Sequence, residues 1–330
     1  IALANQIRNY PKEYCESCRG KIMATLFYEP STRTKMSFQT AMLRLGGEII
    51  GFDNPQSSSV SKGESLKDTV TVVSGYADIL VVRHPLEGAA EAAAMYSRVP
   101  VINAGDGGHL HPTQTLTDLV TLYNEKGRLD NLCIGLCGDL KYGRTVHSLI
   151  KTMTRYHNNS FVLISTPELA LPNYVKDIMN AAGCKYVEVS SLSEAMPMLD
   201  VLYMTRIQQE RFATREQYEA QKGVYVLDRE KLNMGKRDLK VLHPLPRVDE
   251  ITPDVDEDPR AAYFKQTVYG MYARMALIFS MLMNPQYKRK KPPTQSSHPV
   301  ECSNPKCITK TESYLPRLYF ETGDMLECKY

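Results

Sequence analysis

The stretch FYEPSTRTKMSF, residues 27–38, decides how the chain folds around it. Residues 21–28 form an apolar, strand-like segment, and beyond Pro30 the apolar positions recur with helical spacing. A strand that turns directly into a helix places Ser-Thr-Arg-Thr beside unpaired backbone N–H groups and the positive end of the helix. The motif therefore predicts a phosphate site. By itself, the tetrapeptide is explained equally well by a plain helix cap formed by Ser31 or Thr32.

Strand and helix patterns alternate along the rest of the chain. Strands are expected at residues 49–52, 78–82, 99–103, 132–137, 161–165, 185–189, 200–204 and 240–242. Helices are expected at residues 64–76, 87–96, 111–125, 143–156, 172–182 and 260–283, and a polar loop at residues 53–62. Such alternation predicts parallel sheets with helices on both faces. The number of strands suits an α/β fold with two doubly wound parallel-sheet domains, separated near the helix at 111–125.

Composition argues against several classes of protein. The 330 residues are 43% hydrophobic, and 40 basic against 37 acidic residues leave a net charge of +3. This balance gives no reason to expect binding to nucleic acid or to a membrane surface. No apolar run in the sequence approaches the roughly 18 residues that a membrane-spanning helix needs. Without a secretory signal in the sequence, a cytoplasmic location is expected.

The eight cysteines do not form the dense pattern of a disulfide scaffold, which agrees with a reducing compartment. Cys133, Cys137 and Cys184 lie in apolar, strand-like contexts and read as small core residues. Cys15 and Cys18 have a spacing that suits metal binding or redox chemistry, but the sequence has no second pair close by. An incidental surface pair is therefore the favoured interpretation of these two.

The chemically unusual residues follow expected strands. In open parallel sheets, ligands bind beyond the carboxyl ends of the strands. The positions concerned are Ser31–Thr34, Arg83, His111, Arg144, Arg206 and residues 243–247. This shared placement favours a phosphate site at Ser31–Thr34 over a plain helix cap.

Seven segments carry a family resemblance. In chain order they are FYEPSTRTKMSF, SSVSKGESL, VVRHPLEG, NAGDGGHLHPTQTLTDL, GDLKYGRTVHS, YMTRIQQER and VLHPLPRVDEI. Over residues 1–287 the chain resembles the catalytic chains of the aspartate carbamoyltransferase family. The resemblance implies transfer of the carbamoyl group of carbamoyl phosphate to the amine of L-aspartate, a step of pyrimidine biosynthesis. It also implies homotrimers with shared active sites, catalysis without a cofactor and no covalent intermediate.

The resemblance implies a role for each residue of the phosphate half of the site. Ser31, Thr32, Arg33 and Thr34 match the family's phosphate loop, and Arg83 reaches both phosphate and carbonyl oxygen. His111 contacts the carbamoyl carbonyl and Gln114 the carbamoyl amide. Pro244 and Leu245 offer backbone carbonyls to the N–H groups of the substrates. The residues expected to be catalytic are Arg33, Thr34, Arg83 and His111.

A dicarboxylic second substrate requires further cations. By resemblance, Arg144 holds the α-carboxylate of aspartate and Arg206 its side-chain carboxylate, with Gln208 assisting. Arginine suits this task because its planar guanidinium binds a carboxylate through two parallel hydrogen bonds. The resemblance also implies that Ser59 and Lys62 reach into the site of the adjacent subunit.

The expected domains are residues 1–125, completed by the helix at 260–283, for carbamoyl phosphate and residues 126–259 for aspartate. A linker is expected at 288–298 and a partial zinc-binding module at 299–330. ECSNPKCITKTE and LECKY resemble the zinc-binding domain of the family's separate regulatory chain, which implies a fusion and a structural zinc ion on Cys302, Cys307 and Cys328. The given sequence stops at Tyr330, one residue before the position at which the resemblance implies a fourth cysteine. With only three cysteines, His298 or water has to complete the site, or the three remain a disulfide or free thiols.

Two other functions compete with this interpretation. Ornithine carbamoyltransferases share the phosphate chemistry but carry cysteine in the motifs HPCQ and HCLP, where this chain has Thr113 and Pro244. Arg206 further favours a dicarboxylic acceptor. A non-catalytic scaffold with the same fold is disfavoured because no residue of the family's motifs is missing.

Overall fold

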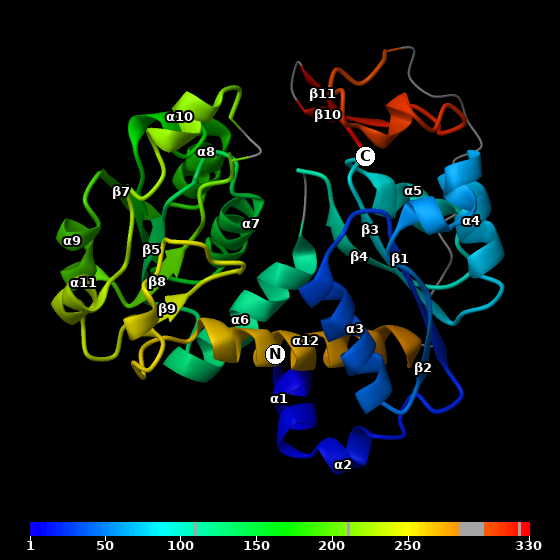
Figure 1. Ribbon diagram of the computed structural model, residues 1–330, viewed down its shortest axis with the longest axis horizontal. Helices are drawn as coiled ribbons and strands as arrows, with labels where there is room; N and C mark the ends of the chain where they lie inside the picture. Colours follow the sequence, from blue (N-terminus) through cyan, green and yellow to red (C-terminus); the bar gives the residue numbers. More distant parts are fainter. Residues whose placement is uncertain (109–110, 210–211, 284–299, 323–324) are drawn as a thin grey trace. The chain divides into compact units, whose positions relative to one another are not determined.

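The computed structural model describes residues 1–108, 111–209, 212–283, 300–322 and 325–330 (Figure 1). The chain divides into two compact units. The split unit comprises Ala2–Thr113 and Met271–Tyr330, and the middle unit comprises Gln114–Gly270 together with Ile1. Within the described ranges, every helix falls short of the length and apolarity that crossing a bilayer requires.

The split unit is built on a parallel sheet with the strand order β2-β1-β3-β4. The strands are β1 (Ile22–Phe27), β2 (Glu48–Phe52), β3 (Ile79–His84) and β4 (Val101–Asp106). The helices are α1 (Ala2–Asn9), α2 (Pro11–Tyr14), α3 (Thr32–Arg44), α4 (Leu66–Val73), α5 (Ala89–Tyr96) and the later part of α12 (Tyr263–Leu282). Short 3-10 turns lie at Pro55–Ser57, Ser59–Lys62 and Ile308–Lys310, and β10 (Tyr319–Thr322) and β11 (Met325–Cys328) form a hairpin.

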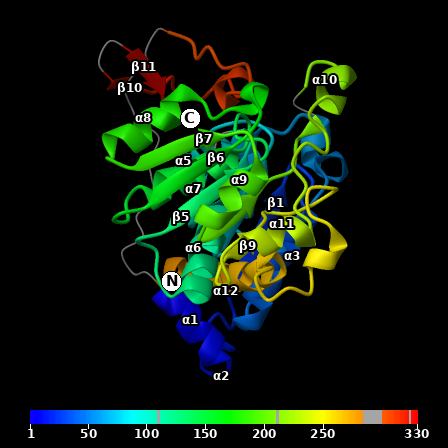
Figure 2. The same cartoon turned by 90° about the vertical axis from the view of Figure 1, so that its left-hand side faces the viewer.

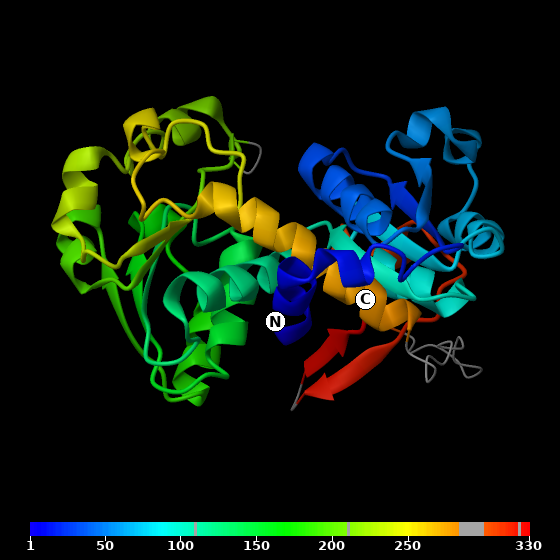
Figure 3. The same cartoon turned by 90° about the horizontal axis from the view of Figure 1, so that it is seen from below.

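Both faces of this sheet are covered. On one face, α4, α5 and the C-terminal segment pack together, with Val70, Ala93 and Ile308 in the buried cluster. On the other face lie α1, α3 and the end of α12, with Phe38 and Ile278 in the cluster. Figure 3 shows α1, in dark blue, against α12, in orange, and the hairpin in red. Helices on both faces explain why β1 and β3 are continuous apolar runs instead of alternating ones.

The middle unit repeats this plan around a five-stranded parallel sheet, with the strand order β7-β6-β5-β8-β9. The strands are β5 (Cys133–Cys137), β6 (Ser160–Ile164), β7 (Lys185–Val189), β8 (Val201–Met204) and β9 (Lys240–Leu242). The helices are α6 (Pro112–Lys126), α7 (Arg144–Met153), α8 (Asn173–Ala181), α9 (Leu192–Ala195), α10 (Arg215–Glu219) and α11 (Arg229–Met234). Figure 2 shows α7 and α8 on one face of the sheet and α9 and α11 on the other, each over its own buried cluster.

The predicted fold class is confirmed, and four details were wrong. β3 runs through Arg83, which was expected to follow the strand. Residues 53–62 contain two 3-10 turns. The short helices α9, α10 and α11 were not expected. Cys18 is fully buried, so it cannot belong to a surface pair, because it fills space in the core beneath α3 while Cys15 is exposed.

Candidate active site

At the start of α3, the side chain of the N-cap residue does not accept from the backbone N–H groups of the first turn, so these groups can donate to another acceptor. Ser31 occupies the N-cap position, but its side chain makes no capping hydrogen bond. Thr32 and Arg33 are exposed, and Thr34 is buried. A helix start of this kind favours an anion through its unpaired N–H groups and its dipole. The plain cap that the tetrapeptide allowed is therefore not what the structure contains.

Arg83 is a buried cation at the end of β3, only 7% exposed. Its Nη1 donates to the carbonyl oxygen of Ala104 at 3.1 Å, and its Nη2 lies 3.2 Å from a carboxylate oxygen of Glu29. Burial lowers the pKa of Arg83, and Glu29 opposes that shift. Glu29 was not predicted as a site residue, although it lies inside the motif at residues 27–38. The ion pair keeps the guanidinium charged in a buried position.

His111 lies beside Arg83 at the start of α6. The His111 ring is buried, and its Nε2 lies 3.5 Å from Nη1 of Arg83. A guanidinium has no acceptor capacity, so His111 can contribute a lone pair here only as the neutral ring. The expected phosphate loop, Arg83 and His111 all belong to the split unit. The two buried residues are in contact, as the sequence predicted for residues of one site.

Gln114 belongs to a buried network around Asp118 in the middle unit. Its Nε2 donates to Asp118 Oδ1 at 2.8 Å, and Nε2 of Gln266 donates to the same oxygen at 2.7 Å. The hydroxyl of Tyr203 donates to Asp118 Oδ2 at 3.1 Å. Burial and the charge of Asp118 raise the pKa of Tyr203 well above its ordinary value. Sequence reasoning missed Asp118, whose signal is its position four residues after Gln114, on the same face of α6.

The loops that carry Arg144 and Arg206 meet at the carboxyl ends of β5 and β8, which pair in parallel. Gly138 adopts a φ of +111°, and a Cβ there would lie 2.4 Å from the carbonyl oxygen of Thr205. Asp139 links the two loops, because its Oδ1 accepts from the backbone N–H of Tyr142 at 2.9 Å and its Oδ2 from Nε2 of Gln208 at 3.4 Å.

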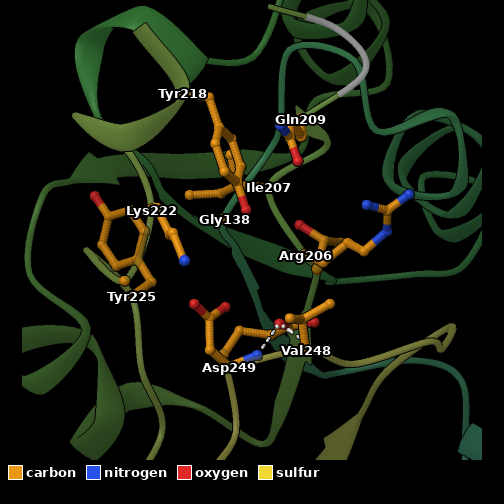
Figure 4. Close-up of a pocket in the computed structure, with 12 residues that line it drawn as sticks. Gly138, Arg206, Ile207, Gln209, Tyr218, Lys222, Tyr225, Val248 and Asp249 are labelled. Atoms are coloured by element: carbon orange, nitrogen blue, oxygen red, sulfur yellow. Dashed lines mark hydrogen bonds between the residues drawn. The ribbon is translucent and has the colours of Figure 1, made fainter. Parts of the chain in front are cut away.

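A pocket of about 190 Å³ opens in the same unit, next to Arg206. Its lining residues are Gly138, Thr205, Arg206, Ile207, Gln209, Tyr218, Lys222, Gly223, Tyr225, Val248, Asp249 and Glu250. In Figure 4 the Lys222 ammonium extends into the pocket, between Tyr225 and Asp249. Two basic residues, Arg206 and Lys222, and two acidic ones, Asp249 and Glu250, line the pocket, so it offers groups of both charges to a small polar ligand. Arg206 was predicted from its motif, whereas Lys222 and Tyr225 were not, because they lie in a segment without regular periodicity.

The segment 243–250 contributes its last three residues, Val248, Asp249 and Glu250, to the wall of this pocket. His243 is 1% exposed and its Nε2 lies 2.6 Å from Oε1 of Glu250, which is also buried. Burial raises the pKa of Glu250, but the hydrogen bonds from His243 and from the backbone of Val248 bring it below its usual value. Pro244 and Leu245, whose backbone carbonyls were expected to accept hydrogen bonds from the substrates, lie between His243 and Glu250 in the sequence. Both residues are half-buried.

Ser59 and Lys62 lie on the surface of the split unit, in the second 3-10 turn. Ser58 caps this turn by accepting from the backbone N–H of Val60, and Gly63 ends it with a φ of +91°. Among the described residues, Lys62 makes no ion pair within 4 Å. A solvent-facing lysine of this kind is available to a second molecule.

Cys302, Cys307 and Cys328 gather at the C-terminal segment, with their sulfur atoms all within 4.8 Å of one another. Cys307 Sγ lies 3.9 Å from Cys328 Sγ. Burial, together with the two neighbouring thiols, raises the pKa of Cys328 to about 12. Such a cluster forms thiolates when a cation is bound, and three thiolates fit zinc. The expected linker at 288–298, and His298 with it, lie outside the described residues.

The C-terminal segment is bound to the split unit through the loop after β3. The N–H of Glu87 donates to the carbonyl oxygen of Lys306, and the N–H of Ile308 donates to that of Glu87, both at 2.9 Å. Gly88 permits this approach, because a Cβ there would lie 2.4 Å from Cβ of Tyr330. The segment that carries the cysteine cluster therefore contacts Glu87, which lies four residues along the chain from the buried Arg83.

Comparisons with known proteins agree with this arrangement. The family model for the carbamoyl-P binding domain of aspartate/ornithine carbamoyltransferases matches residues 1–124, and the model for their Asp/Orn binding domain matches residues 130–281. The chain is 58% identical over 282 residues to the aspartate carbamoyltransferase catalytic subunit of Clostridium novyi, covering 86% of this chain and 92% of that protein. It is 61% identical over 281 residues to that of Clostridium perfringens, covering 85% and 92%.

Solved structures give the same result. The catalytic subunit of M. jannaschii aspartate transcarbamoylase superposes with a TM-score of 0.81 at 48% identity, covering 87% of this chain and 94% of that one. Aspartate transcarbamoylase from Trypanosoma cruzi, in complex with N-(phosphonacetyl)-L-aspartic acid, superposes with a TM-score of 0.79 at 40% identity, covering 84% and 89%.

Proposed function

Since the chain belongs to the aspartate/ornithine carbamoyltransferase family, we propose that it acts as the catalytic subunit of an aspartate carbamoyltransferase (EC 2.1.3.2). It transfers the carbamoyl group of carbamoyl phosphate to the amine of L-aspartate and releases N-carbamoyl-L-aspartate and phosphate. The observation that carries the choice of acceptor is the pair of arginine-bearing loops at the ends of β5 and β8, beside a pocket that contains Arg206 and Lys222. Two cationic loops suit two carboxylates.

The phosphate of carbamoyl phosphate is assigned to the start of α3, with Ser31, Thr32, Arg33 and Thr34. Support comes from the N-cap side chain that leaves the first-turn N–H groups to other acceptors. The carbamoyl oxygen is assigned to Thr34, Arg83 and His111, and the carbamoyl amide to Gln114 and the carbonyls of Pro244 and Leu245. Arg144, Arg206 and Gln208 are assigned to aspartate.

Catalysis then rests on position and charge. The aspartate amine attacks the carbonyl carbon, and negative charge develops on the oxygen that Thr34, Arg83 and His111 surround. Fixed donors aimed at developing charge stabilise the transition state more than the ground state. The carbonyl re-forms as the bond to phosphate breaks, and the departing phosphate accepts the proton of the amine. No covalent enzyme intermediate is needed.

The acceptor is tested by direct competition. The purified chain is incubated with carbamoyl phosphate and equal concentrations of L-aspartate and L-ornithine, and both carbamoylated products are quantified by mass spectrometry. N-carbamoyl-L-aspartate is expected to dominate. Carbamoylornithine as the main product, or no product from either amine, would refute the proposal.

We further propose a homotrimer in which Ser59 and Lys62 complete the site of the adjacent subunit. Both side chains are exposed on the split unit, and Lys62 makes no ion pair among the described residues. The domains are assigned as before, with residues 1–125 and 260–283 for carbamoyl phosphate and 126–259 for aspartate. Mixing the variants Lys62→Ala and His111→Ala tests the sharing of sites. Recovery of activity is expected only after reassembly, because some trimers then contain one intact site.

For the C-terminal segment, we propose a fused module, residues 299–330, that resembles a regulatory-chain zinc domain. Cys302, Cys307 and Cys328 supply three thiolate ligands, as their clustered sulfur atoms allow. Metal analysis of the purified chain tests this, with one zinc per chain as the expected result. A cluster that stays metal-free after dialysis against zinc contradicts it.

A further inference from the structure

The segment HPLPRVDE, residues 243–250, folds back on itself through two buried side chains. Nδ1 of His243 accepts from the backbone N–H of Leu245 at 2.8 Å. A ring nitrogen that accepts a backbone N–H carries no proton, so in the neutral ring the proton lies on Nε2. That Nε2–H donates to Oε1 of Glu250 at 2.6 Å. The imidazole therefore bridges the first half of the segment to its end.

Glu250 uses its second carboxylate oxygen to hold the turn that lies between His243 and Glu250. Its Oε2 accepts from the backbone N–H groups of Val248 and Asp249, each at 3.0 Å. Figure 4 shows these two hydrogen bonds at the wall of the pocket that also contains Arg206. The same carboxylate thus fixes a wall of the candidate aspartate pocket and orients the His243 ring.

The backbone between the two side chains is strained. Leu245 has a φ of +54°, a left-handed conformation that a leucine rarely adopts. Residues in such conformations persist where their surroundings determine them, and they concentrate at functional sites. Here the hydrogen bond from the Leu245 N–H to His243 holds the strained residue directly. The strain and the two buried side chains therefore belong to one arrangement.

A further contact anchors the segment to the network around Asp118. The backbone N–H of His243 donates to Oε1 of Gln266 at 3.0 Å, and Nε2 of Gln266 donates to Asp118. Asp118 also accepts from Gln114. The segment and Gln114 are thus held through shared partners in the middle unit.

We propose that His243 and Glu250 are positioning residues of the reaction. They hold Pro244 and Leu245 so that their backbone carbonyls face the N–H groups of the two substrates, without touching the reacting atoms themselves. This inference rests on the proposed carbamoyl transfer. A carbonyl displaced by about 1 Å lowers the rate strongly, because the reacting groups lose their alignment.

Three variants separate the contacts. His243→Leu removes both hydrogen bonds of the ring. His243→Asn keeps an acceptor that reaches the N–H of the residue two positions on, but loses the donor to Glu250. Glu250→Gln keeps one oxygen where the native side chain uses two. We expect kcat to fall about 100-fold in His243→Leu and about tenfold in the other two.

Inorganic phosphate provides the diagnostic probe, because it has no N–H group for the two carbonyls to bind. Its inhibition constant against carbamoyl phosphate is expected to stay within about twofold of the native value, while the KM of carbamoyl phosphate rises. Asn159→Ala serves as the control for lost stability. Asn159 is buried, and its side chain accepts from the N–H of Leu132 and donates to the carbonyl oxygens of Leu129 and Met153. These contacts lie at the start of β5, at the opposite end of the strand from the candidate site.

The outcomes are distinct. If phosphate inhibition weakens in parallel with turnover, or if Asn159→Ala loses kcat as His243→Leu does, the two residues are merely structural and the inference fails. Unchanged kcat in His243→Leu overturns it as well. A native chain without carbamoyl transfer refutes the proposed function, and it overturns this inference as well, because no substrate N–H groups then meet the two carbonyls.

Discussion

Arg83 and Gly105 are in such close contact that a Cβ on Gly105 would lie 2.8 Å from Nη1 of the arginine. Gly105 also has a φ of +123°, which side chains rarely tolerate. The absence of a side chain thus creates the space in which a buried guanidinium lies between Ala104 and His111. We expect Gly105→Ala to displace Arg83 and to lower kcat/KM for carbamoyl phosphate about 100-fold. Steady-state kinetics check this.

Gly20→Ala is the matched control for that variant. Gly20 lies in the same unit with a φ of +74°, and a Cβ there would meet nothing within 4 Å. It therefore reports the backbone strain alone. An equal loss of kcat/KM in both variants would show that strain, rather than the position of Arg83, explains the effect.

His111→Ala should lower kcat by about 10²–10³, because it removes a fixed group beside the developing negative charge. The KM for aspartate should change little, since the aspartate contacts are assigned to Arg144 and Arg206. The exposed His157 provides the control, and His157→Ala should retain native turnover. Near-native kcat in His111→Ala would exclude this residue from catalysis.

Arg206→Gln should weaken aspartate binding and leave carbamoyl phosphate binding intact. Loss of a charge-assisted hydrogen bond costs about 1.5–3 kcal/mol, which corresponds to about 10- to 100-fold in kcat/KM for aspartate. Arg229→Gln is the control, because that arginine pairs with Asp258 elsewhere in the middle unit. If the KM of carbamoyl phosphate rose as much as the KM of aspartate, the assignment of Arg206 to the aspartate site would be wrong.

His84 should make the chain sensitive to acid. Burial lowers the pKa of His84 from 6.5 to about 4, although Asp106 opposes the shift. The folded state therefore keeps a neutral ring while the unfolded state takes up a proton as the pH falls below 6.5. Stability is lost between pH 6.5 and about 4, by up to about 3 kcal/mol.

His84→Asn removes this titration and keeps an acceptor for the N–H of Leu86, which Nδ1 of His84 accepts at 3.0 Å. The urea midpoints of native chain and variant, measured from pH 8 to 4, should differ by a constant amount above pH 7. Below pH 6.5 the native chain should lose stability relative to the variant. Parallel pH curves would contradict the assignment.

Loss of the proposed zinc ion should destabilise the split unit, because the cysteine cluster is part of its core. Cys307 and Ile308 are buried with Leu80 and Val82 in one cluster. Cys307→Ser is expected to abolish zinc binding and to lower the melting temperature by about 5–10 °C, as a loss of 2–3 kcal/mol does in a unit of this size. The exposed Cys15 is the control, and Cys15→Ser should keep both zinc and stability.

The sequence predicted the long elements well because their hydrophobic periodicity is strong. All eight strands expected at residues 49–242, and the one at 21–28, are present with small shifts at the ends. The short helices α9, α10 and α11 span 4–6 residues, too few for a periodic signal, and their formation depends on tertiary packing. Propensity also gave no sign that β3 continues through Arg83, since a buried arginine needs its partner Glu29, which is distant in the sequence.

Site residues inside recognisable motifs could be predicted, whereas their supporting partners could not. His111 and Arg83 stand in motifs, and the structure brings them together. Asp118, Glu29 and the pair His243–Glu250 act through contacts between segments, which spacing does not reveal. In VLHPLPRVDEI, Glu250 lies seven positions after His243. This spacing predicts a contact only when the conformation of the turn between the two residues is known.

The discontinuity of the split unit imposes an order on synthesis. Met275 and Ile278 of α12 share a buried cluster with Ile7 and Phe38, yet residues 114–270 intervene. At about 5–20 residues per second, a ribosome needs about 10–30 s to make that insert. During this interval one face of the first sheet has no α12 to cover it, whereas the contiguous middle unit has its sequence as soon as the interval ends. The nascent chain therefore completes its second sheet domain before its first, and its early apolar surface is what a chaperone would meet.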